Sequence, residues 1–95
     1  MNLASRVQKG LKLVVQRYGK WQVSRISLRK LDMGNECNCV LGQLEGGYEA
    51  GKKALGLDFV PGTPYGFSLS SDEATFDAWD KLDLLWTNAI RRLRG

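Results

Sequence analysis

Two stretches at opposite ends of the sequence carry apolar residues at the three- and four-residue spacing of an amphipathic helix. The first stripe consists of Leu3, Val7, Leu11, Val14 and Tyr18, and Gly19 follows it as a helix terminator. The second stripe consists of Trp79, Leu82, Trp86, Ile90 and Leu93. Together they predict a mainly α fold.

The length and composition of the chain limit how much can be added to these two helices. With 95 residues, 43% of them hydrophobic, the chain suits a single small globular domain over residues 1–95. We expect a compact three-helix domain, with an irregular or short-strand connector between the first two helices. The connector, residues 20–35, shows no sustained period, and we expect it to bury Trp21, Ile26 and Leu31.

The last helix carries the clearest local signals. Ser70 and Glu73 have the spacing of a capping box, and acidic residues early in the segment give way to arginines at its end, as the helix dipole favours. We therefore expect the helix to begin near Ser70, with Trp79 and Trp86 packing on the core. The preceding segment contains both prolines and reads as a loop, whose Phe59, Tyr65 and Phe67 are expected to fold back over the core.

The middle of the chain, residues 37–55, has a helical apolar pattern that several glycines interrupt. In one continuous helix Gly42, Gly46 and Ala50 would form a strip of nearly bare backbone opposite the apolar stripe. Each interior glycine costs about 0.5–1 kcal/mol relative to alanine, so a compensating contact or a broken helix is required. Three interpretations stay open: packing inside the molecule, docking of a partner or a second copy, and an interrupted helix.

Charge is distributed unevenly along the chain. Residues 1–31 carry eight basic side chains and no acidic one, whereas residues 32–95 carry six basic and ten acidic side chains. This asymmetry is typical of a surface for nucleic acid or an acidic partner, and also of an ordinary solvated face. The candidate partner-binding residues are Arg6, Lys9, Leu13 and Arg17 of the first helix, together with Gly42, Gly46 and Ala50. The candidate nucleic-acid contacts are Arg6, Lys9, Arg17, Lys20, Arg25, Arg29 and Lys30.

The residues needed for common catalytic and metal sites are missing from the sequence. Histidine is absent, which removes the most frequent general base and metal ligand. Cys37 and Cys39 are separated by one residue, which is neither the redox C-x-x-C spacing nor a complete zinc site. The glycines form no phosphate-binding loop. We therefore expect no enzyme activity, no cofactor and no metal, and the lack of a signal or membrane-spanning segment predicts a cytoplasmic protein.

Several landmarks beyond Trp21 occur in a familiar order: "LDM" at 31–33, "CVLGQ" at 39–43, "GGY" at 46–48, "LG" at 55–56 and "YGF" at 65–67, followed by an acid-rich helix with Trp79 and Trp86. Over roughly residues 21–92 the chain resembles a family of short proteins of actinobacteriophages and actinobacterial prophages. The family pattern has an acidic pair and a proline before the tryptophan, whereas this chain has the basic "QRYGKW". The resemblance implies a phage-encoded protein in the host cytoplasm and carries over no activity or site residue.

The function predicted from these features is a non-enzymatic interaction module, a phage-encoded modulator that binds a host protein. The alternative is a nucleic-acid-binding protein that uses the acid-free first third of the chain. A third hypothesis is a virion component or a homo-oligomer that buries the glycine strip. No membrane partner is expected.

Overall fold

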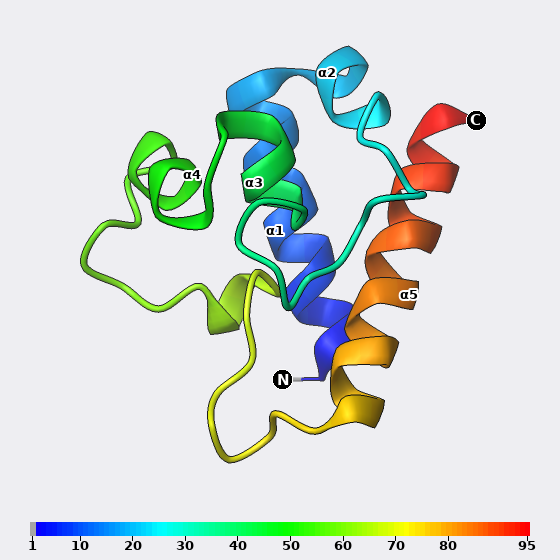
Figure 1. The fold of residues 1–95 in the computed structure, drawn as a ribbon. Helices are drawn as coiled ribbons and strands as arrows, with labels where there is room; N and C mark the ends of the chain where they lie inside the picture. Colours follow the sequence, from blue (N-terminus) through cyan, green and yellow to red (C-terminus); the bar gives the residue numbers. More distant parts are fainter. Residues whose placement is uncertain (1) are drawn as a thin grey trace.

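The computed structural model describes residues 2–95, and within this range it contains helices, turns and loops but no β-strand (Figure 1). Two long helices, α1 (Leu3–Tyr18) and α5 (Phe76–Arg94), pack against each other. Three short α-helices, α2 (Lys20–Ser24), α3 (Val40–Glu45) and α4 (Tyr48–Ala54), and the 3-10 turn η1 (Thr63–Tyr65) complete the fold. The predicted mainly α class is confirmed, although the helices are more numerous and shorter than expected.

Helix α1 begins and ends where its sequence predicts. The side chain of Asn2 accepts a hydrogen bond from the Ser5 amide at 2.8 Å, which caps the first turn. At the other end Gly19 has a φ of +87° and donates its amide to Val15. Val7 and Val14 of the predicted stripe are buried. Between them Gly10 allows η1 to approach closely, since a Cβ at this position would collide with the Tyr65 carbonyl oxygen.

The connector after Gly19 is partly helical, and this changes which side chains it buries. Trp21 is 74% exposed, so its predicted burial is wrong, whereas Ile26 is buried and Leu31 lies partly buried against the core. In a helix, residues two positions apart point to nearly opposite sides. Val23 is fully buried, and the helical backbone of α2 therefore turns Trp21 outward.

The predicted middle helix over residues 37–55 is interrupted. Gly46 adopts a left-handed conformation with a φ of +93° and ends α3, and α4 begins after Gly47. The two short helices then pack closely, because Gly51 lies so near Leu41 that an added Cβ would approach the Leu41 Cβ to 2.5 Å. The interpretation of an interrupted helix is confirmed, and the continuous strip of small residues does not exist.

Helix α5 begins later than predicted. The Ser70 amide does donate to the Glu73 carboxylate at 3.0 Å, but this pair forms a turn, and the helix starts at Phe76 after the cap Thr75. The apolar stripe of α5 is confirmed: Leu82, Trp86 and Ile90 are fully buried. Trp86 lies against Phe67, with ring centroids 5.7 Å apart, and α1, α3 and the segment after η1 contribute the residues around this pair.

The loop before α5 covers the core only in part. Phe67 is buried and Tyr65 is half-buried, as expected. Phe59 is 99% exposed, so the prediction that it folds over the core is wrong. Among the apolar residues of this loop, Leu57, Phe67 and Leu69 are buried, whereas Phe59 and Val60 are exposed.

Candidate functional site

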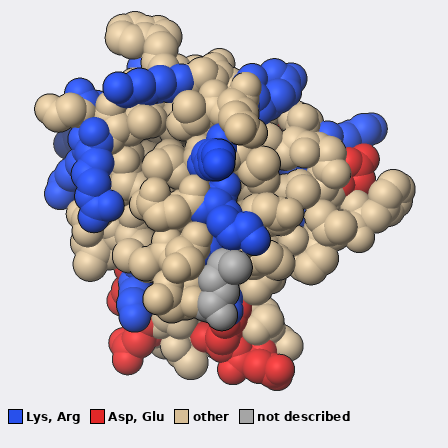
Figure 2. All heavy atoms as spheres, turned by 180° about the vertical axis from the view of Figure 1, so that it is seen from behind, with Lys and Arg blue, Asp and Glu red and all other residues tan. Residues whose placement is uncertain are grey.

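Basic side chains gather on the face that carries α1. Seen from behind, Lys and Arg spread over the upper part and one edge of this face, and the acidic side chains visible from this side lie mostly at its lower edge (Figure 2). Within residues 2–95 the one ion pair is between Arg6 and Glu73, whose Nη1 and Oε1 atoms are 2.8 Å apart. The other basic side chains of this part of the chain have no carboxylate partner within 4.0 Å.

Arg6 is therefore engaged inside the molecule. Its bond to Glu73 links α1 to the turn before α5, across 67 positions of sequence. The Glu73 carboxylate also accepts the Ser70 amide, and these two contacts, the backbone bond first, lower the pKa of Glu73 below its ordinary value. Arg6 belongs to both predicted sites, but its guanidinium is paired with Glu73 within the molecule.

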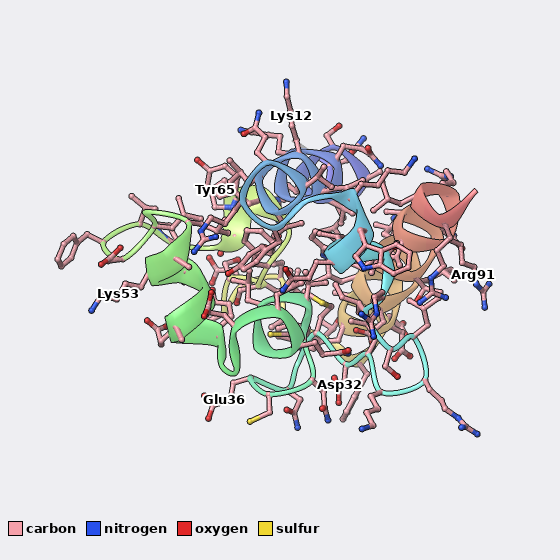
Figure 3. The ribbon with its side chains drawn as sticks, turned by 90° about the horizontal axis from the view of Figure 1, so that it is seen from above. Lys12, Asp32, Glu36, Lys53, Tyr65 and Arg91 are labelled. Carbon is pink, nitrogen blue, oxygen red and sulfur yellow. The ribbon has the colours of Figure 1, made fainter. Side chains whose placement is uncertain are left out.

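Three further cations of α1 and its end face solvent. Lys9 lies over the Tyr65 ring at 5.3 Å and Arg17 over the Tyr18 ring at 5.1 Å, so each keeps its charge exposed while its stem rests on an aromatic surface. Lys12 points directly away from the molecule (Figure 3). Leu13, which the sequence offers as a candidate partner-binding residue, is partly buried against the core.

Three cations, Lys20, Arg25 and Arg94, lie around the exposed Trp21. Together with Trp21 and Leu93 they form what we call the Trp21 cluster. These five residues and Ser24 line an open depression of about 620 Å³. The Arg25 guanidinium lies 5.7 Å from the centre of the indole ring. Trp21 and Arg25 also line a second depression of about 440 Å³, together with Gln22, Ile26, Gln43 and Leu44.

The end of α5 is fixed onto α2 by Arg94. Its Nε donates to the Ser24 carbonyl at 2.7 Å and its Nη2 to the Ile26 carbonyl at 2.6 Å. These carbonyls lie at the C-terminal end of α2, where a cation also suits the helix dipole. Arg94 was missed as a site residue, because 70 positions separate it from Ser24 and its charge is explained locally by the dipole of α5.

Arg29 and Lys30 lie apart from the other predicted nucleic-acid contacts. They border a depression that three carboxylates also line, those of Asp32, Asp80 and Asp83. Asp83 accepts the Met33 amide at 2.7 Å, and its burial, with the charges of Asp32 and Asp80, raises its pKa. Anionic ligands would be repelled here, so these two basic residues do not extend the basic surface.

Gly42 and Cys39 of the middle segment are buried and have structural roles. Gly42 is buried beneath the turn before α3, where a Cβ would collide with the Glu36 carbonyl oxygen. Cys39 caps α3 by accepting the Gly42 amide on its sulfur at 3.3 Å, and burial raises the pKa of its thiol. Cys37 is exposed, and residues 2–95 hold no group of three potential metal ligands. Gly46 ends α3 and Ala50 is exposed on α4, so the three predicted strip residues occupy different settings.

Tyr18 joins α1 to α3 through its hydroxyl, which donates to Glu45 at 2.8 Å. Burial, the hydrogen bond to Glu45 and the charge of Glu45 raise the pKa of Tyr18 from 10.0 to about 12. Because the folded pKa lies above the unfolded one, the protonated phenol stabilises the fold below pH 10, and this stabilisation is lost as the pH rises to 12.

Glu45→Gln is expected to lower the pKa of Tyr18 and to flatten this alkaline loss of stability. Ultraviolet absorbance of the tyrosinate and urea denaturation at several alkaline pH values measure the two effects. Glu36→Gln, which removes an exposed charge elsewhere, is the matched control. Identical titrations for the wild type and Glu45→Gln would contradict the assignment.

No protein-family model matches this chain, and comparisons with curated proteins and with solved structures also give no match. Among residues 2–95, no helix has both the length and the apolar character needed to cross a bilayer.

Proposed function

We propose that the protein binds nucleic acid by placing the phosphates on the face formed by α1, α2 and the end of α5. The observation that carries this proposal is the set of cations without carboxylate partners on that face. We call this set the basic face: Lys9, Lys12, Arg17, Lys20, Arg25 and Arg94. Side chains of this kind neutralise phosphates and release the counterions condensed on the polymer, which drives binding.

The fold supports the proposal because it separates the basic residues that have acidic neighbours from those that do not. Arg6 pairs with Glu73, and Arg29 and Lys30 border carboxylates, so these residues leave the set predicted from the sequence. Arg94 joins it, because α5 ends beside α2. The two depressions beside Trp21 have no acidic residue among their lining residues in the described chain. A surface with one sign of charge attracts a polyanion over the range of the Debye length, about 8–10 Å at physiological salt.

The double charge reversal Lys12→Glu with Lys20→Glu is expected to weaken binding to a labelled oligonucleotide. The slope of log affinity against log salt should fall in magnitude by about 2, since each lysine contributes about one released counterion. Fluorescence anisotropy at several salt concentrations measures both quantities. The matched control is Lys53→Glu with Lys81→Glu, which makes the same change in net charge at exposed positions of α4 and α5. Equal losses in the two double variants would contradict a localised basic face.

A host protein as the partner is the second candidate function, and the exposed loop favours it. Phe59 is 99% exposed and its neighbour Val60 is 42% exposed, and aromatic residues of this kind are enriched at the centres of protein interfaces. In this case the protein would act as a modulator of that host protein, and the family resemblance implies only that it is phage-encoded and works in the cytoplasm of the bacterial host.

Affinity capture from a bacterial lysate, with and without nuclease, separates the two candidates. Nucleic acid recovered with the wild type and lost with Lys12→Glu/Lys20→Glu supports the proposed function. A single stoichiometric protein that survives nuclease and is lost with Phe59→Ser would favour the second candidate instead.

A further inference from the structure

The most exposed tryptophan of the protein is also the one with the most cations around it. Trp86 is fully buried and Trp79 is partly buried, whereas Trp21 exposes 74% of its surface. Leaving a large aromatic side chain in water forgoes the stabilisation that its burial would supply. The fold has an apolar core nearby to which Val23 and Ile26 contribute, so the outward position of Trp21 is a property of α2.

Two of the three cations around Trp21, Arg25 and Arg94, are held in place by contacts within the structure. Arg94 is fixed by its two bonds to the carbonyls of Ser24 and Ile26, and Arg25 lies against the indole ring. Lys20 precedes Trp21 in the same turn of helix and lines the same depression. Trp21 lines two acid-free depressions, and the Arg25 guanidinium lies over its ring while Lys20 and Arg94 line one of the same depressions. An exposed aromatic ring among cations matches the chemistry of a nucleotide, in which a planar base is attached to a phosphate.

We propose that Trp21 is a stacking platform for an unpaired base, so that the ligand of the basic face is single-stranded nucleic acid. This inference rests on the proposed function and names its substrate class. Bases in a duplex are already stacked on their neighbours, whereas an unpaired base can stack on an aromatic side chain while basic residues follow the backbone. Stacking of this kind tolerates any base, so it requires no element that reads base edges.

Phe76 shows that exposure alone does not make such a site. It is 92% exposed, but the depression that it lines has three carboxylates, those of Asp32, Asp80 and Asp83, against the two cations Arg29 and Lys30. These carboxylates would repel the phosphates of a strand whose base approached the ring. Phe76 is therefore the matched control for Trp21, as an exposed aromatic residue in the wrong electrostatic setting.

The test is fluorescence anisotropy with labelled oligothymidylate, oligouridylate and a DNA duplex of the same length. Trp21→Ala should bind the single strands about 5- to 150-fold more weakly, the range for one stacked base, with little change for the duplex. Its salt slope should stay unchanged, since no cation is removed. Trp21→Phe should retain most of the affinity, and Phe76→Ala should bind as the wild type does. Single-strand binding that is weakened by Trp21→Ala and not by Phe76→Ala supports the proposal, whichever of the two strands binds more strongly.

The outcomes separate this inference from the proposed function. Salt-dependent binding that Trp21→Ala leaves intact, or a preference for the duplex, would overturn the stacking platform while the basic face still stands. Failure of every oligonucleotide to bind would overturn both. Because the Trp21 side chain is largely exposed, Trp21→Ala is expected to fold, and its circular dichroism and urea midpoint verify this.

Discussion

Replacing Gly42 with alanine is expected to destabilise the protein by about 3 kcal/mol, the cost of overpacking a close-packed interior. The added Cβ would collide with the Glu36 carbonyl oxygen and lie 2.5 Å from the carbonyl carbon and oxygen of Cys37. These are backbone atoms of a turn that Asn35 holds: its side chain accepts the Cys37 and Asn38 amides at 2.8 and 3.0 Å. The turn therefore has little freedom to retreat.

Intrinsic helix propensity alone would make Gly42→Ala stabilising, because it favours alanine over glycine by about 1 kcal/mol. A measured loss of stability therefore indicates that the collision with the turn outweighs the gain in propensity. Urea denaturation gives the change in the free energy of unfolding. Gly47→Ala is the matched control, since Gly47 has an extended φ of −177° and no atom within 4 Å of its would-be Cβ. We expect its effect to stay within about 0.5 kcal/mol. A Gly42→Ala variant as stable as the wild type would contradict this account and would mean that the turn yields to the added methyl group.

The two glycines also show what the sequence could and could not predict. Gly42 and Gly47 belong to the same glycine-rich stretch, but Gly42 lies in α3 beneath a packed turn, whereas Gly47 is the extended cap of α4 with no atom near its would-be Cβ. Helices α1 and α5 were predictable because each repeats its apolar stripe over several turns. Helix α2 has five residues, fewer than two turns, so its period could not be told from the alternation of a strand. The error at Trp21 follows from this ambiguity.

The sequence predicted that the candidate site is basic, but it did not predict which basic residues belong to it. The acid-free first third of the sequence indicated a basic surface, and α1 and α2 do present one. Arg6 left this surface through its bond to Glu73, and Arg94 entered it through its bonds to α2. Both changes depend on contacts between segments about 70 positions apart, for which local patterns carry no signal.

Trp86→Ala is expected to destabilise the protein by about 3–5 kcal/mol, the usual cost of emptying a buried tryptophan site. Trp86 is fully buried, stacks on Phe67 and donates its indole N–H to the Gly66 carbonyl at 2.7 Å. It also lies against Gly10, where an added Cβ would come within 3.0 Å of its ring, so it joins α5 to α1 and to the segment after η1. Its removal would leave a cavity and an unpaired buried carbonyl.

The free energy of unfolding of a small domain is typically about 5–15 kcal/mol, so a loss of this size is a large part of it. Urea and thermal denaturation should both show the loss clearly. Trp86→Phe keeps the stacking surface but loses the hydrogen bond, and it should cost distinctly less than Trp86→Ala. Trp21→Ala, the same substitution at an exposed site, should change stability by no more than about 0.5 kcal/mol. Comparable destabilisation by Trp21→Ala would show that Trp21 supports the fold, and its effect on oligonucleotide binding would then no longer identify a stacking platform. We therefore expect Trp86→Ala to lower mainly the stability of the protein and Trp21→Ala to lower mainly its affinity for single strands.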